Sequence, residues 1–285
     1  MCGIAGYLAK SDAPCAVGAR LLAMLTALAC RGPDSAGVAT WGAAALGLKI
    51  RVKTAAGLEA FEADTGDAKA LTRTIEAREP GAEVVSMGRR LEIVKQVGGP
   101  AELEAAFGVS ALAGTHALGH TRLSTESRID LSHSQPFWAH GTPDLAVVHN
   151  GHITNYHRLR RIYEQEGIRF YTDNDSEIIG IYLARQLQAG AALEEALEAS
   201  VKELDGSFSY LVATEDAFGF AKDPFCLKPL IVGEDAGAIA IANEEIALHE
   251  ALVEPYMARE AGAGEVGVWK VGVVAAPSPV RTGTR

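Results

Sequence analysis

One residue near the start of the chain carries two groups that catalysis can use. Cys2 follows Met1 directly, so removal of Met1 would leave a cysteine with both a thiol and a free α-amino group. The amine can take the thiol proton directly or through one water, and no second residue is needed as the base. An α-amino group titrates near pH ~8, which suits a general base. Most cysteines at a second position have no such role, so the rest of the chain must decide.

A thiolate that attacks an amide needs donors for the negative charge that grows on the carbonyl oxygen. Asn150 and Gly151 are adjacent and offer a side-chain amide beside a backbone N–H that can be approached closely. The pair therefore predicts an oxyanion hole. The alternative is an ordinary Asn-Gly turn, which is the more common meaning of that dipeptide taken alone.

An amino-acid substrate also has a carboxylate and an ammonium group to be held. Arg122 suits the carboxylate because its planar guanidinium forms two parallel hydrogen bonds, and Asp175 suits the ammonium. Each has a structural alternative, which is an ion pair for Arg122 and a helix cap for Asp175.

Composition narrows the class of protein. The chain of 285 residues is 48% hydrophobic and 22% charged, with a net charge of -10, as expected for a globular protein with a large core. It has no block of Lys and Arg, no apolar run of membrane-spanning length and no leader segment in which basic residues precede apolar ones. We therefore expect a cytoplasmic protein that binds neither nucleic acid nor membrane.

The cysteines argue against a metal site. Cys2, Cys15, Cys30 and Cys226 form no C-x-x-C pair, and no histidine lies at ligand spacing from them. This pattern predicts no zinc site and a reducing compartment, with the last three cysteines as small apolar core residues.

The helices and strands that would position these groups follow one another in no regular order along the chain. Helical periodicity favours helices over 17–29, 100–107, 158–165 and 193–204, and another that begins within 172–179. Strands are expected at 4–8, 43–52 and 84–87, and they dominate beyond residue 206. Segments 31–37, 119–127, 132–137 and 147–156 are polar and loop-like. The pattern predicts an α+β fold with layered sheets.

Six segments together resemble one family. They are CGIAGY (2–7), RGPDSAG (31–37), GHTRLST (119–125), SQPF (134–137), VHNGHITNY (148–156) and TDNDSEII (172–179), and they occur in the order found in class II glutamine amidotransferases, which are N-terminal-nucleophile hydrolases. LDGSFSYLV (204–212), KDPFCLKPL (222–230) and ANEEIAL (242–248) continue the likeness. The resemblance implies a four-layer αββα sandwich of two antiparallel sheets, with one amidotransferase domain over 1–275 and a polar tail at 276–285.

The resemblance also implies catalytic roles. Cys2 matches the nucleophile, with its own amine as base, and Asn150 with Gly151 matches the oxyanion hole. No metal and no organic cofactor is expected in this chain; a flavin or iron–sulfur centre would belong to partner subunits.

Binding roles follow in the same way. Arg122 matches the residue that binds the glutamine α-carboxylate, with Thr125 in the same loop, and Asp175 matches the residue that binds the α-amino group. Arg31 and Asp34 match the loop that supports the terminal cysteine.

The chain carries no acceptor domain after the segments that resemble the glutaminase, so its ammonia is expected to pass to a partner. GHTRLSTES, KDPFCLKPL and the long early segment 41–114 are most similar to the separate amidotransferase subunits of split glutamate synthases and N-methylglutamate synthase. Two alternatives remain open: a non-catalytic glutamine-binding or assembly subunit, and an N-terminal-nucleophile amidase of other specificity. The function of 41–114 is also open.

Overall fold

Two antiparallel sheets form the centre of the protein. The computed structural model describes residues 2–64, 66–124 and 128–272. The first sheet has the strand order β14-β12-β13-β1-β7-β2-β6 and the second β15-β11-β10-β9-β8, and every strand pair in them is antiparallel. Their bounds are β1 Gly3–Ala9, β2 Ser35–Trp41, β6 Leu91–Val97, β7 His116–Arg122, β8 Phe137–Trp138, β9 Ala146–Ile153, β10 Gly206–Ala213, β11 Ala217–Lys222, β12 Ile231–Glu234, β13 Ala238–Ala242, β14 Met257–Glu260 and β15 Val266–Lys270.

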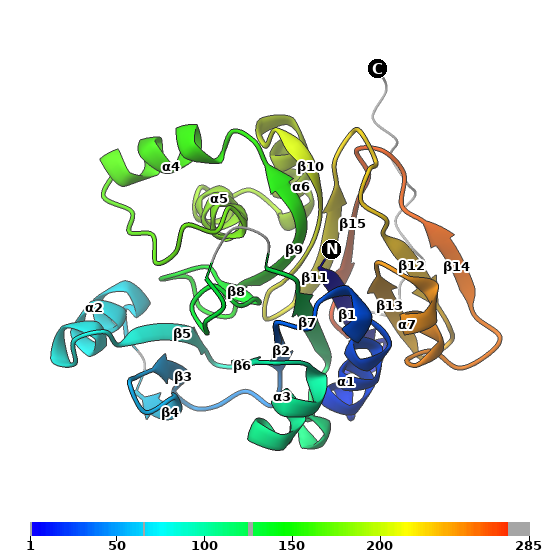
Figure 1. Ribbon diagram of the computed structural model, residues 1–285, viewed down its shortest axis with the longest axis horizontal. Coiled ribbons are helices and arrows are strands. Elements are labelled where there is room, and N and C mark those ends of the chain that lie inside the picture. Colours follow the sequence, from blue (N-terminus) through cyan, green and yellow to red (C-terminus); the bar gives the residue numbers. More distant parts are fainter. Residues whose placement is uncertain (1, 65, 125–127, 273–285) are drawn as a thin grey trace.

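Helices cover both outer faces, which gives four layers (Figure 1). On the first sheet lie α1 (Val17–Ala27), α3 (Pro100–Phe107) and α7 (Glu245–His249), and on the second α5 (Ser176–Gln188) and α6 (Leu193–Glu203), with α4 (Tyr156–Gln165) beside α5. The αββα sandwich is thus confirmed. The two sheets approach closely at Gly6 of β1, which has no side chain. A Cβ at this position would lie 2.6 Å from the ring of Phe218 on β11 of the second sheet.

A third sheet is inserted between β2 and β6. It has the order β4-β3-β5, with β3 Leu48–Lys53, β4 Leu58–Ala63 and β5 Glu83–Gly88, and α2 (Ala68–Arg78) precedes β5. Asp67 caps α2 by accepting hydrogen bonds from the N–H groups of Lys69 and Ala70. We call the three strands and α2 the inserted sheet; Figure 1 shows it at the end of the molecule opposite β12 and β14.

Two segments expected to be loops are strands. Most of 119–127 that is described belongs to β7, and most of 147–156 belongs to β9. β7 is polar yet buried along its whole length, with His116, His120, Thr121 and Arg122 inside the protein. Polar residues kept at a buried site remove the alternation that marks a strand. The loop expected over 31–37 is shorter as well, since β2 begins at Ser35.

Four further predictions concern the cysteines, the strand at 43–52, membrane spans and the C-terminal tail. The cysteines are free thiols in the described chain. Cys15 and Cys226 are partly buried, whereas Cys30 is exposed, so the prediction that Cys30 is a small apolar packing residue was wrong. The strand expected over 43–52 begins only at Leu48. No helix in the described part of the chain is long and apolar enough to cross a membrane. The predicted tail at 276–285 lies outside the described residues.

Candidate active site

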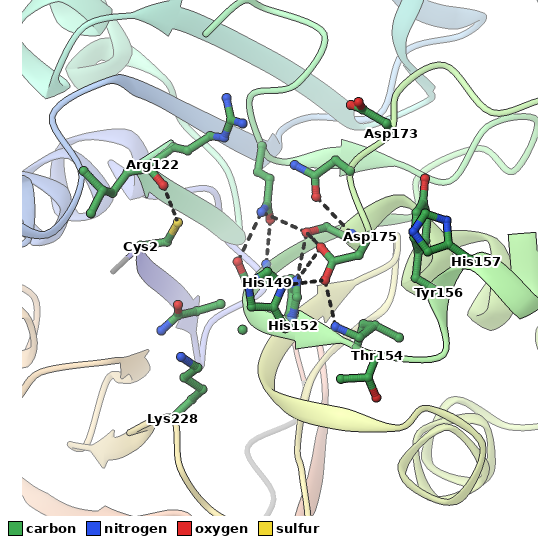
Figure 2. Close-up of a pocket in the computed structure, with 17 residues that line it drawn as sticks. Cys2, Arg122, His149, His152, Thr154, Tyr156, His157, Asp173, Asp175 and Lys228 are labelled. Carbon is green, nitrogen blue, oxygen red and sulfur yellow. Dashed lines mark hydrogen bonds and ion pairs between the residues drawn. The ribbon is translucent and has the colours of Figure 1, made fainter. Parts of the chain in front are cut away.

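A pocket of about 530 Å³ lies between the N-terminal ends of β1 and α5 and the C-terminal ends of β7 and β9. Five of the residues singled out in the sequence line it: Cys2, Arg122, Asn150, Gly151 and Asp175. They come from four segments that are far apart in the chain. In Figure 2, Cys2 lies on one side of the pocket and Asp175 on the other.

Cys2 is held at the pocket wall by its neighbours. Its Sγ lies 3.8 Å from the carbonyl oxygen of Leu123, and its own carbonyl accepts a hydrogen bond from Arg31 Nε at 3.2 Å. Arg31 also forms an ion pair with Glu244. Burial raises the pKa of the Cys2 thiol, while the backbone of Leu123 and nearby Arg122 oppose that shift. A base is therefore needed to form the thiolate near neutral pH. Met1 lies outside the described residues.

Asn150 offers an unused donor. Its side chain is buried on β9, and its Nδ2 has no hydrogen-bond partner in the described structure. A buried donor without a partner is costly, and it occurs at sites that a ligand completes. Gly151 follows with φ 143°, and a Cβ there would lie 2.1 Å from the carbonyl oxygen of Ser207. Only glycine fits this position. The pair is part of a strand and does not form the turn that was the alternative.

Asp175 immediately precedes α5, but its side chain does not cap the helix. Its Oδ2 accepts a hydrogen bond from the N–H of Ile153 at 2.7 Å. His149 and His152 approach the same carboxylate at 3.8 and 3.7 Å. The carboxylate lines the pocket, with Oδ2 held by Ile153 and Oδ1 3.5 Å from Ser176 Oγ (Figure 2).

Arg122 and Asp34 join the cysteine side of the pocket to β2. The N–H of Asp34 donates to the Arg122 carbonyl at 3.0 Å, and Asp34 Oδ2 accepts from the N–H of Ser124 at 2.7 Å. Arg122 Nη1 donates to the carbonyl of Arg128 at 2.7 Å. Asp34 and Arg31 do not line the pocket; they fix the segments that do. Thr125 lies outside the described residues.

Known proteins are similar to this chain over most of its length. Residues 120–250 match the family described as glutamine amidotransferase domain. A putative glutamine amidotransferase of Methanothermobacter thermautotrophicus is 37% identical over 95% of this chain and 100% of its own length. The glutamine amidotransferase-like protein GlxB of Rhizobium meliloti is 35% identical over 87% of this chain and 91% of its own length. The chain belongs to the class II glutamine amidotransferases.

A solved structure supports the fold of this amidotransferase. The glutamine phosphoribosylpyrophosphate amidotransferase of B. subtilis matches 93% of this chain with a TM-score of 0.66 at 23% identity. The match covers 46% of that longer chain. The N-terminal-nucleophile hydrolase fold is therefore confirmed.

Gln135 is a pocket residue to which sequence reasoning gave no role, although it stands in the SQPF segment. Its side-chain Oε1 accepts from the N–H of His149 at 2.6 Å, and its Nε2 donates to the carbonyl of His149 at 3.2 Å and to Ser176 Oγ at 3.1 Å. One side chain thus ties the residue before Asn150 to the first turn of α5, next to Asp175. The position of Gln135 inside SQPF, a segment that resembles the family, was the signal in the sequence that could have identified it.

Histidine 149 completes this connection. Its Nδ1 lies 2.8 Å from Ser176 Oγ, and burial lowers its pKa, so the ring is neutral near pH 7. Lys228 also lines the pocket (Figure 2). In the described residues, no group of three His, Cys, Asp or Glu side chains is placed to hold a metal ion.

Proposed function

We propose that this chain is a glutaminase subunit that hydrolyses the glutamine side-chain amide through a Cys2 thioester and delivers ammonia to a partner synthase subunit. The observation that carries the proposal is the pairing of Cys2 with the unused buried donor of Asn150 in one pocket. Family membership supports the amide of glutamine as the bond that is broken.

Glutamine binding is assigned to two charged side chains. Arg122, with Thr125 in the same loop, holds the α-carboxylate, and Asp175 holds the α-ammonium group. The hydrogen bond from the Ile153 N–H holds Asp175 Oδ2 in place, and Oδ1, which lies 3.5 Å from Ser176 Oγ, is the oxygen assigned to the ammonium group. A substrate held by both charged groups on its α-carbon extends its side-chain amide toward the cysteine side of the pocket, where Arg31 and Asp34 fix the chain.

The reaction then proceeds in two steps. The Cys2 α-amine, exposed by removal of Met1, takes the thiol proton, and the thiolate attacks the amide carbon. Asn150 Nδ2 and the Gly151 N–H stabilise the oxyanion. The C–N bond breaks, the Cys2 ammonium gives its proton to the leaving ammonia, and a γ-glutamyl thioester remains. Water adds to the thioester, the C–S bond breaks and glutamate leaves with the thiol restored.

The partner belongs to the proposal because released ammonia is useful only if an acceptor captures it. The two relatives described simply as glutamine amidotransferases align over nearly their full length, whereas the match to the phosphoribosylpyrophosphate enzyme covers less than half of that chain. This supports an acceptor site on another polypeptide. We assign that polypeptide to the glutamate synthase or N-methylglutamate synthase type on the resemblance of GHTRLSTES and KDPFCLKPL alone. Any flavin or iron–sulfur centre would reside there.

The test uses the complex purified with its natural partners. Cys2→Ala should abolish glutamine-dependent synthesis and leave ammonia-dependent synthesis unchanged. Intact mass of the active chain should show loss of Met1. If both activities disappear together in a folded complex, Cys2 has a structural role and the proposal is wrong.

Two further measurements separate the alternatives. A glutamine-like electrophile should label Cys2, because the thiolate attacks it; a protein that only binds glutamine stays unlabelled. In a panel of amides, glutamine should be the best substrate, and a better substrate of another class would identify a different amidase.

A further inference from the structure

The inserted sheet contacts the segments that form one wall of the pocket (Figure 1). We propose that the inserted sheet sets the affinity for glutamine by holding residues 169–175, and that Glu76 is the positioning residue that does this. The inference rests on the proposed role of Asp175 in binding the substrate ammonium group.

Glu76 is an unusual residue for an exposed helix. It lies on α2, yet its side chain is only 6% exposed. Its Oε1 accepts from the N–H of Val84 at 3.1 Å, which fixes the carboxylate to β5. Its Oε2 accepts from the Tyr171 hydroxyl and from Arg169 Nη1, each at 2.9 Å. A single buried carboxylate thus connects the inserted sheet to the segment that leads to the pocket.

Tyr171 is held from several directions. Its ring stacks on His140 with centroids 3.8 Å apart, and its N–H donates to Glu177 Oε1 at 2.9 Å. Burial and the Glu76 carboxylate raise the pKa of Tyr171, so its hydroxyl stays protonated and remains a donor to Glu76. Glu76 therefore sets where the hydroxyl end of this ring lies.

From Tyr171 a short hydrogen-bonded path leads to the substrate site. Thr172 donates its N–H to Glu177 Oε2 at 3.0 Å, and its Oγ1 accepts from the N–H of Asn174 at 3.1 Å. The side chain of Asn174 then accepts from the N–H of Ser176 at 3.0 Å. Asp173, Asn174 and Asp175, which all line the pocket, lie within this path.

The inserted sheet also holds a second segment. Lys53 of β3 and Glu83 of β5 form an ion pair at 3.1 Å, and both contact Ser132 Oγ. The next residue, His133, lies 2.7 Å from Asp173. The inserted sheet thus reaches the wall by two routes, one from Glu76 on α2 and one from β3 and β5, and a shift of the inserted sheet would move residues 169–175 with it.

The test compares Glu76→Gln with Glu265→Gln. Glu265 is a matched control because it too is a buried acid, 4% exposed, that pairs with one arginine and accepts one backbone N–H, yet it does not line the pocket or contact 169–175. In the Glu76→Gln variant, the side-chain NH₂ group would face groups that are themselves hydrogen-bond donors, such as the Tyr171 hydroxyl and Arg169 Nη1. We expect the KM for glutamine to rise about 3- to 30-fold with kcat within twofold, the range for residues coupled to a site. Glu265→Gln should change neither constant.

Tyr171→Phe provides a second variant that removes only the hydroxyl. It should raise KM in the same direction, and the double variant with Glu76→Gln should show less than the product of the two effects, because both remove one contact. Equal changes in KM for Glu76→Gln and Glu265→Gln, or independent effects of Glu76→Gln and Tyr171→Phe, would overturn the proposal.

Hydrogen exchange provides a readout that does not need activity. The amides of 169–175 should exchange faster in Glu76→Gln than in the wild type and remain unchanged in Glu265→Gln. Unchanged exchange in Glu76→Gln refutes the positioning role. Faster exchange in a chain that does not hydrolyse glutamine would refute the proposed function and support the positioning role.

Discussion

Replacing Asn150 with alanine removes one donor from the proposed oxyanion hole. Loss of one such donor costs about 3 kcal/mol of transition-state stabilisation, which corresponds to a fall in kcat of roughly 10²-fold. The structure predicts that the loss falls on kcat and not on KM. Substrate binding is assigned to Arg122 and Asp175, and Asn150 Nδ2 forms no hydrogen bond with any described residue, so its loss leaves both binding side chains in place.

The stability of this variant should change little. Asn150 Nδ2 has no hydrogen-bond partner in the described protein, so alanine removes a buried unsatisfied donor and breaks no bond of that nitrogen. Asn155 gives the opposite case nearby. Its Nδ2 donates to the Glu203 carbonyl at 2.8 Å, its Oδ1 accepts from the N–H of Asp205 at 3.1 Å, and it does not line the pocket. Asn155→Ala should lose about 1–3 kcal/mol of unfolding free energy and keep kcat.

Steady-state glutamine hydrolysis and urea unfolding, measured on both variants, separate the two effects. The reasoning is refuted if Asn150→Ala retains more than about a tenth of the wild-type kcat, since a donor at the oxyanion is worth more than that. It is also refuted if Asn150→Ala loses as much stability as Asn155→Ala, because the amide would then be a structural group.

Two other predictions concern neighbouring features. Gln135→Leu leaves the N–H of His149 without its partner and leaves the His149 carbonyl with His120 Nε2 alone, so it should lose about 2 kcal/mol of stability in urea unfolding and lower kcat at least tenfold, as Asn150 is the next residue; a variant with full kcat would contradict the assigned connection. Burial lowers the pKa of His116 to about 4 and of His120 to about 3. Below pH ~6.5 the unfolded chain therefore binds protons that the native chain does not, and unfolding free energy should fall by up to roughly 3 kcal/mol per pH unit. Equal stability at pH 7 and pH 5 would show that these rings are protonated in the native state.

The hydrophobic pattern of the sequence predicted the outer helices of the sandwich better than it predicted β7 and β9, the strands that carry the site. The helices at 17–29, 100–107 and 193–204 correspond to α1, α3 and α6, because each buries one apolar face. β7 and β9 were missed because their buried positions carry histidine, arginine and asparagine. The segments that looked least like strands are those that carry the site.

The inserted sheet shows another limit of the sequence. β4 has exposed residues at four successive positions, so its burial has no period of two. It is an edge strand paired on one side only, and nothing covers it strongly enough to select an alternating pattern. Its place in the fold is decided by its antiparallel pairing with β3, which forms only when the chain folds.

Residues that touch the substrate and residues that position them leave different traces in a sequence. Cys2, Asn150 and Asp175 were identified because their chemistry requires one residue type beside a glycine, a helix start or the chain terminus. Glu76 acts through Tyr171, 95 residues away, and any buried acceptor at that distance would satisfy the hydroxyl. This is why a folded structure was needed to connect the inserted sheet with the pocket.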